Sequence, residues 1–176
     1  MMRETVSVLI SAAAIDDRLT ELAAQIKEDY GDKPLTLVCA LKGAVIFLAD
    51  LSRKLDNNVE FDFLRVSSYG DESISNGAVA LSHKTGSLKD RHVLLIEDIA
   101  DTGHTLVFLR KHLMSMEPAS LKICVLLDKP DRRQTPDAKF DYLGFSIPDV
   151  FIVGYGLDYA QRYRNLPFIG ALSFEE

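Results

Sequence analysis

The sequence predicts an α/β fold, in which a central, mostly parallel sheet is flanked by helices and accompanied by a small accessory hood and a flexible loop. Short, almost continuously apolar segments alternate with segments of helical periodicity, and a parallel sheet covered on both faces requires this pattern. The length of 176 residues, with 47% hydrophobic and 26% charged residues, suits one domain with a sizeable core.

The first part of the chain predicts a helix followed by a strand–turn–helix unit. In residues 16–30 the apolar side chains recur at helical spacing, and Gly31 offers a stop. The short apolar run 35–41 contains β-branched residues and predicts a strand. Residues 44–55 follow a Lys-Gly turn and predict a second helix.

The second part of the chain continues the alternation. Strands are predicted at residues 59–66, 92–97 and 120–127, and a helix at 103–116. The polar, weakly patterned segment from about 67 to 91 is long for a compact domain, which is typical of a functional lid or a mobile hairpin. After Pro130, two short apolar segments at 140–145 and 150–155 predict a small accessory sheet near the main one.

Charge and cysteine content narrow the function classes. A net charge of −6 and a pI near 5.2 give no global positive field, so no nucleic-acid partner is expected. Cys39 and Cys124 lie inside apolar runs, which predicts buried, reduced thiols. No apolar stretch reaches the roughly 18 residues of a membrane span. We therefore expect no membrane partner and a cytoplasmic protein.

Residues 93–106 carry the clearest chemical signal. An apolar strand ends on Glu97-Asp98, and ligands of open α/β sheets bind at the carboxyl ends of the strands. Two adjacent acids that close a buried strand are costly unless something pairs with them. Sugar hydroxyls or a hydrated metal ion would serve as partners.

The next residues of this loop suit a phosphate. Thr102, Gly103 and Thr105 supply backbone amides and hydroxyl groups where a helix begins, and the helix dipole favours an anion there. An N-capping turn would by itself account for Asp101 and Thr102. It would not account for the two acids before them, so the loop predicts a ribose-phosphate site.

The stretch EDIADTGHT resembles the phosphoribosyl pyrophosphate motif of the type I phosphoribosyltransferases, specifically of their hypoxanthine–guanine branch. Further matches follow in the family's order. Leu41-Lys42-Gly43 resembles the pyrophosphate loop, Ser68-Tyr69 the start of the flexible catalytic loop, and residues 147–159 (IPDVFIVGYGLDY) the purine-binding segment. Lys129 and Arg164 stand at matching positions. Agreement across all of these motifs, in the same order, is specific to the family, whereas a lone Asp-Thr-Gly would mean little.

The resemblance implies one domain over residues 1–176, with a mobile loop at about 67–91 and a purine-binding hood formed by about 129–176 and the N-terminus. It implies purine salvage, in which the 5-phosphoribosyl group of phosphoribosyl pyrophosphate passes to hypoxanthine and/or guanine, giving IMP or GMP and pyrophosphate. It also implies Mg²⁺ as cofactor and a homodimer or homotetramer.

The resemblance also implies a role for each matched residue. Asp101 would exchange a proton with purine N7 as the catalytic residue. Ribose 5-phosphate would be bound by Glu97, Asp98, Asp101, Thr102, Gly103, His104 and Thr105, and pyrophosphate by Lys42, Gly43 and Arg164. The purine would be bound by Lys129, Phe151, Ile152 and Asp158, and metal by Glu97, Asp98 and Asp158. Ala100 and His104 depart from the commonest family pattern, but neither departure removes a required group.

Three alternatives were weighed against this interpretation. Asp101-Thr102-Gly103 also resembles the triplet of aspartic proteases, but those enzymes are β-rich, whereas strands alternate with helices here. A regulator with the same fold could bind RNA, although the chain is acidic and lacks a basic stripe. The same enzyme class could serve xanthine or adenine, and the sequence leaves the choice of purine open.

Overall fold

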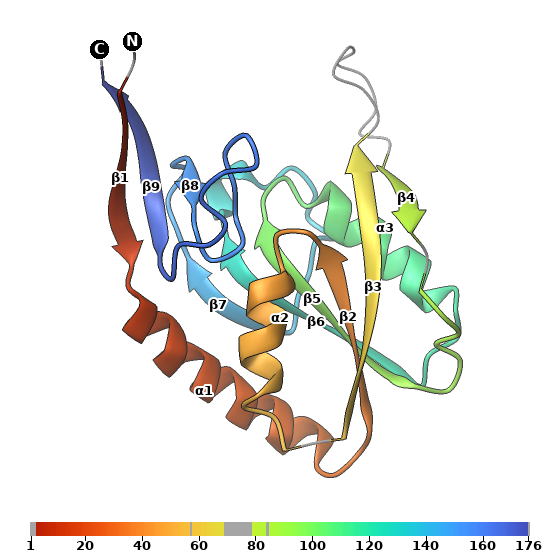
Figure 1. Ribbon diagram of the computed structural model, residues 1–176. Coiled ribbons are helices and arrows are strands. Elements are labelled where there is room, and N and C mark those ends of the chain that lie inside the picture. The colour runs from red at the N-terminus through yellow and green to blue at the C-terminus, as the bar shows by residue number, and fades with distance from the viewer. Residues whose placement is uncertain (1–2, 57, 69–78, 84, 176) are drawn as a thin grey trace.

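The computed structural model describes residues 3–56, 58–68, 79–83 and 85–175, which form two sheets (Figure 1). The main sheet has six strands in the order β4-β3-β2-β5-β6-β7. All neighbours are parallel except β4, which runs antiparallel to β3. The strands are β2 (Leu35–Leu41), β3 (Val59–Ser68), β4 (Val79–His83), β5 (His92–Ala100), β6 (Ser120–Asp128) and β7 (Tyr142–Ser146). The predicted α/β class with a mostly parallel sheet is confirmed.

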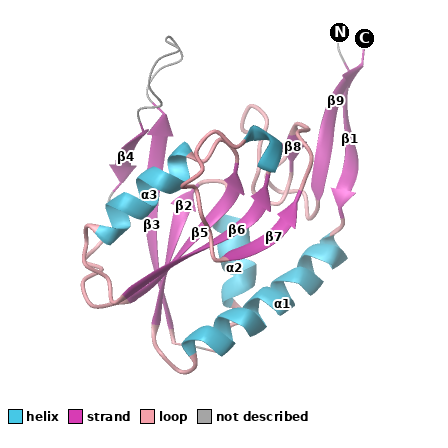
Figure 2. Cartoon of the chain, turned by 180° about the vertical axis from the view of Figure 1, so that it is seen from behind, coloured by secondary structure: helices cyan, strands magenta, loops and turns pink. Residues whose placement is uncertain are grey.

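Helices cover both faces of this sheet (Figure 2). Helices α1 (Ala12–Tyr30) and α2 (Val45–Ser52) pack on one face, and α3 (His104–Met114) packs on the other. A short 3₁₀ turn, η1 (Pro130–Arg132), follows β6. The start of α1 is capped by the Ser11 hydroxyl, which accepts a hydrogen bond from the Ala14 amide at 3.2 Å. Among the described residues, no helix combines the length and the apolar character that crossing a membrane would need.

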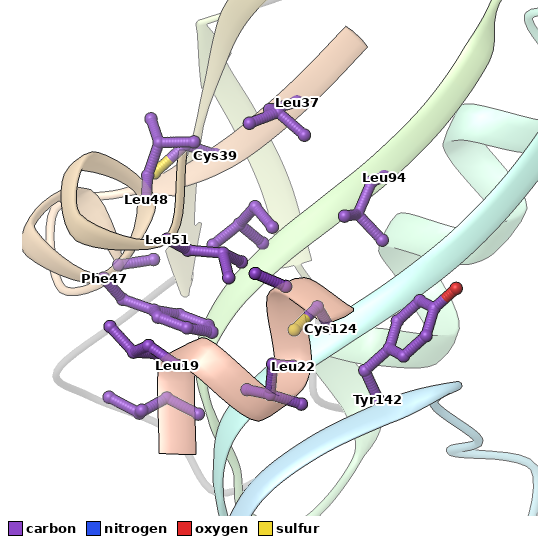
Figure 3. Packing of buried hydrophobic residues seen from close by; sticks show 14 of the residues in the cluster. Leu19, Leu22, Leu37, Cys39, Phe47, Leu48, Leu51, Leu94, Cys124 and Tyr142 are labelled. Atoms are coloured by element: carbon purple, nitrogen blue, oxygen red, sulfur yellow. The ribbon is translucent and has the colours of Figure 1, made fainter. Parts of the chain in front are cut away.

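The central strands separate two apolar cores because successive side chains of a strand point to opposite faces. On β5, Leu94 and Ile96 face α1 and α2, whereas Val93 and Leu95 face α3. Figure 3 shows the first core, where Leu19 and Leu22 of α1 and Phe47, Leu48 and Leu51 of α2 meet the sheet. Both predicted thiols, Cys39 and Cys124, are free and buried in this core.

Leu51 tests how strongly α2 depends on this packing. Its side chain is fully buried, so Leu51→Ala is expected to lower the free energy of unfolding by about 2–5 kcal/mol, through lost apolar burial and the cavity left behind. Urea unfolding measures this difference. Val45→Ala on the same helix, where the side chain is 40% exposed, should stay within about 0.5 kcal/mol of wild type. Equal losses in both variants would contradict the described packing.

The second sheet joins the two ends of the chain, as Figure 1 shows. Its order is β1-β9-β8, with β1 (Arg3–Ile10) and β8 (Ile152–Val153) both antiparallel to β9 (Ile169–Glu175). The predicted accessory sheet therefore exists, but the prediction for residues 140–145 was wrong. This segment forms β7, the edge strand of the main sheet, where Gly144 lies so close to the Leu126 carbonyl that any side chain would overlap it.

Within segment 67–91, the described residues include part of an antiparallel strand pair, which agrees with the hairpin that the sequence predicted as one alternative. Strand β3 continues to Ser68, β4 pairs with it from Val79, and Leu88 is buried against the core under α3. Tyr69, named above with Ser68 as the start of the catalytic loop, lies outside the described residues.

Candidate active site

The carboxyl ends of β2 and β5 lie side by side at the centre of the sheet. From β2 the chain continues into α2 on one face, and from β5 it continues into α3 on the other. Adjacent strands whose connections leave on opposite faces open a crevice at their carboxyl ends, which is where such sheets bind ligands. Lys42 and Gly43 follow β2 at this point, and Glu97 and Asp98 lie near the end of β5. The fold therefore brings together two motifs that are over 50 residues apart.

Two glycines permit the close packing of this crevice. A side-chain carbon on Gly43 would fall inside the carboxylate of Asp98. Gly156 has a φ of 103°, and a side-chain carbon on it would lie only 2.1 Å from the Gly43 carbonyl oxygen, so it would overlap the backbone. Three segments thus meet here: the end of β5, the loop after β2, and the turn after β8.

Of the two acids on β5, Glu97 is buried and Asp98 is partly buried, and neither forms an ion pair with another described residue. Glu97 is only 7% exposed, and its Oε2 is buried with no hydrogen-bond partner among the described residues. Burial, followed by the charge of Asp98, raises the pKa of Glu97 well above its ordinary value. Burial also raises the pKa of Asp98, although hydrogen bonds, including one from the Ile99 amide, and the Arg164 charge oppose it. A ligand that binds these carboxylates would relieve an existing cost.

This cost gives a pH-dependent stability prediction. A carboxyl group whose folded pKa lies above its unfolded value destabilises the fold as pH rises from the unfolded towards the folded pKa. Glu97→Gln in the absence of substrate is therefore expected to raise the free energy of unfolding at pH 8 by roughly 1–3 kcal/mol. The gain should be smaller at pH 5. Urea unfolding at both pH values measures it, with exposed Glu28→Gln as control. A Glu97→Gln variant that loses stability at pH 8 would refute the argument.

The loop between β5 and α3 encloses a cavity of about 170 Å³. Gly103, at a φ of 93°, precedes α3, and no side chain of the described residues caps that helix end. The first amides of α3 are therefore available to an anion. The cavity is lined by Glu97, Asp98, Ile99, Ala100, Asp101, Thr102, Gly103, Thr105 and Leu106. This set contains six of the seven residues assigned to ribose 5-phosphate; His104 is exposed and lies 3.2 Å from Gln134 Oε1 instead.

A segment after η1 supports this loop from behind. The Thr102 carbonyl accepts hydrogen bonds from the amides of Gln134 at 3.0 Å and Thr135 at 3.2 Å. A side-chain carbon on Gly103 would come within 2.6 Å of both Ala138 and Thr135. The loop conformation is therefore determined by packing as well as by the positive φ of its glycine.

Two of the residues assigned to pyrophosphate, Lys42 and Arg164, meet at the side chain of Gln161. Lys42 Nζ lies 3.3 Å from Gln161 Oε1, and Arg164 Nη2 lies 3.2 Å from the same oxygen. Arg164 also pairs with Asp158 at 2.7 Å and donates to the Gly156 carbonyl at 2.8 Å. Sequence analysis did not identify Gln161, because its significance depends on the turn that folds residues 154–164 back onto the loop after β2.

Of the residues assigned to the purine, Lys129 follows β6, Phe151 and Ile152 lie at the start of β8, and Asp158 lies in the turn after β8. Lys129, 7% exposed, donates to the Val150 carbonyl at 2.7 Å. Phe151 is 51% exposed and makes an edge contact with Tyr159, with ring centres 5.6 Å apart. Ile152 pairs with Ala171 in the small sheet. A buried cation and an exposed aromatic face are thus both available to a planar base. Tyr159 was quoted in the motif but not assigned a role.

Asp101 lies at the mouth of the phosphate loop. Its side chain is 40% exposed, and Oδ1 accepts a hydrogen bond from Arg132 Nε at 2.9 Å. Arg132 also lies 3.7 Å from Asp149, which lies 3.6 Å from Lys129. Asp149 lies inside the predicted purine-binding segment but was given no role of its own, and Arg132 was not identified from the sequence.

The donor groups fit a metal ion that is completed by substrate oxygens. Within the described residues, no three His, Cys, Asp or Glu side chains gather closely enough to hold an ion by themselves. Glu97 and Asp98 offer adjacent carboxylates, one with an unpartnered oxygen, which suits an ion that takes few carboxylates. Asp158 is occupied by Arg164 and by the Gln161 amide, so it would reach an ion only through water.

Comparison with known proteins places this geometry in a family. A model of the phosphoribosyl transferase domain matches residues 10–160. Hypoxanthine phosphoribosyltransferase of Haemophilus influenzae is 46% identical, covering all of both chains, and hypoxanthine-guanine phosphoribosyltransferase of Bacillus subtilis is 44% identical, covering 98% of this chain and 96% of that one. A crystal structure of the Bacillus anthracis hypoxanthine-guanine enzyme superposes with a TM-score of 0.90 at 40% identity, covering 97% of this chain and 99% of that one. The chain belongs to the phosphoribosyl transferase family.

Proposed function

We propose that the chain transfers the 5-phosphoribosyl group of phosphoribosyl pyrophosphate to hypoxanthine and/or guanine, releasing pyrophosphate and giving IMP or GMP. The observation that carries this proposal is the cavity between β5 and α3, where the carboxylates of Glu97 and Asp98 adjoin a helix start that no side chain of the described residues caps. Sugar hydroxyls suit the carboxylates, and a 5-phosphate suits the helix amides. The names of the similar enzymes support hypoxanthine and guanine as bases.

The ribose would be held from two directions. Glu97 and Asp98 would accept hydrogen bonds from its 2- and 3-hydroxyls, while Thr102, Gly103 and Thr105 would bind the 5-phosphate. Fixing both ends of the sugar orients C1 for displacement by the base nitrogen. Asp101, next to the cavity and exposed towards solvent, would exchange a proton with purine N7 as bonding at N9 changes.

The leaving pyrophosphate would be bound by the groups around Gln161. Lys42 and Arg164 supply positive charge there, and the backbone around Gly43 supplies amides. We infer Mg²⁺ as cofactor, held by Glu97 and Asp98 and, through water, by Asp158. When bound with the substrate, it would neutralise part of the charge on the pyrophosphate oxygens.

A 6-oxopurine would be recognised by its oxygen. Lys129 can donate a hydrogen bond to O6, whereas the 6-amino group of adenine is itself a donor. The Lys129 ammonium donates one hydrogen bond to the Val150 carbonyl, and an ammonium has three donors, so it can also donate to a purine oxygen. The exposed face of Phe151 would stack on the purine ring, the Ile152 backbone would bind its edge, and Asp158 would lie near the base.

We propose that residues 1–176 form a single catalytic domain. Residues 129–176 and the N-terminal strand would form the hood over the base. The loop at about 67–91, in which Ser68-Tyr69 starts the catalytic motif, would close over the bound substrates. By analogy with the family, we infer a homodimer or homotetramer working in the cytoplasm.

The proposal is tested by incubating the protein with phosphoribosyl pyrophosphate and Mg²⁺ in the presence of hypoxanthine, guanine, xanthine or adenine, and following nucleotide formation by ultraviolet absorbance. Turnover of hypoxanthine and/or guanine, with adenine unused, is expected. Preference for xanthine would change the assigned base. No turnover of any purine by folded protein would refute the transfer reaction itself.

A further inference from the structure

We propose that Arg132 is a positioning residue that orients Asp101 for proton exchange and links it to the purine-recognition lysine through Asp149. This inference rests on the proposed function. Four charged side chains form a continuous series: Asp101, Arg132, Asp149 and Lys129. The series joins the group expected at purine N7 to the group expected at O6.

The contact between Arg132 and Asp101 leaves the acid available. Arg132 Nε donates to Oδ1 at 2.9 Å, and within the described part of the chain the hydrogen bonds to this carboxylate are confined to that oxygen. Oδ2 is therefore left for the base. An exposed ion pair of this kind contributes little to stability. Its effect would instead be geometric, because a carboxylate held by one oxygen has less rotational freedom to lose when the purine binds.

The shape of the arginine side chain explains how it reaches two acids. Nε faces Asp101, while Nη1 lies 3.7 Å from Asp149 Oδ2, so one planar group spans both carboxylates. A lysine would place its charge on one nitrogen and could not present two separately placed donor groups in a fixed plane. Arginine at position 132 therefore couples η1 to both the loop after β5 and the segment before β8.

Asp149 extends the arrangement to the base site. Its Oδ1 lies 3.6 Å from Lys129 Nζ, which also donates to the adjacent Val150 carbonyl at 2.7 Å. Asp149 thereby fixes Lys129 and Arg132 relative to each other. A purine that binds Lys129 through O6 would find Asp101 already placed on the same side.

The test compares Arg132→Gln and Arg132→Lys with wild type in steady-state turnover and in binding of phosphoribosyl pyrophosphate. Arg132→Gln is expected to lower kcat by roughly 10- to 100-fold, as misplacement of a catalytic group does. Binding of phosphoribosyl pyrophosphate should change less than threefold, since Arg132 does not line the phosphate cavity. Arg132→Lys should recover part of the lost kcat.

Arg110→Gln is the matched control. Arg110, on α3, forms a partly exposed ion pair with Asp141, and neither residue lines the cavity between β5 and α3. It should keep wild-type kinetics.

Asp149→Asn should raise KM for hypoxanthine and lower kcat. The combined effect of Asp149→Asn and Arg132→Gln should be smaller than the product of the two single effects. If wild type is active and Arg132→Gln stays within twofold of it, the positioning role is wrong while the proposed function stands. An inactive wild type would refute the proposed function instead.

Discussion

Asp101→Asn is expected to lower kcat by about 100- to 10,000-fold, the range over which a positioned acid–base group contributes. An amide has nearly the shape of the carboxylate and can still line the phosphate cavity. It cannot take up a proton from purine N7. Binding of phosphoribosyl pyrophosphate, measured by calorimetry, should therefore remain within a few-fold of wild type, while pre-steady-state nucleotide formation becomes slow.

Asp137→Asn provides the control, since Asp137 is exposed on the segment that supports the same loop. It should leave both kcat and binding unchanged. If Asp101→Asn retains wild-type turnover, the acid–base role is assigned to the wrong residue. Loss of phosphoribosyl pyrophosphate binding in step with kcat would instead make Asp101 a binding group.

Gly43→Ala is expected to reduce kcat/KM for phosphoribosyl pyrophosphate by roughly 100-fold or more, the effect of displacing catalytic groups by about 1 Å. The added methyl group would occupy the position of the Asp98 carboxylate. The loop cannot retreat easily, because the backbone of Gly156 packs on its other side. Asp98 would be forced away from the ribose hydroxyls, so affinity for the substrate should fall together with turnover.

Gly31→Ala tests the specificity of this effect. Gly31 ends α1, and a side-chain carbon there would meet no other atom within 4 Å, so the kinetics should match wild type even though the φ of 55° makes the substitution strained. Circular dichroism and urea unfolding would show whether Gly43→Ala is folded. A folded Gly43→Ala enzyme with normal kcat/KM would show that the crevice between β2 and β5 is not the substrate site.

The sequence alone predicted the central strands of the sheet and grouped most of the residues that line the cavity between β5 and α3. Strand β2 and the cores of β5 and β6 are apolar runs that are buried on both faces, as the central strands of a parallel sheet require. The acids, glycine and threonines of residues 97–105 were recognisable because a strand, a loop and a helix start follow one another directly. Local order was enough to group them.

Only the tertiary structure decided how distant segments meet. Segment 140–145 has the apolar character of either sheet, and its place beside β6 depends on the close approach that Gly144 allows. Strands β1 and β9 pair the two ends of the chain, which no local pattern encodes. Arg132, Asp149 and Gln161 are ordinary polar residues in sequence. They gain significance from partners brought near by the folded backbone, because interactions between charges depend on distance in space and not along the chain.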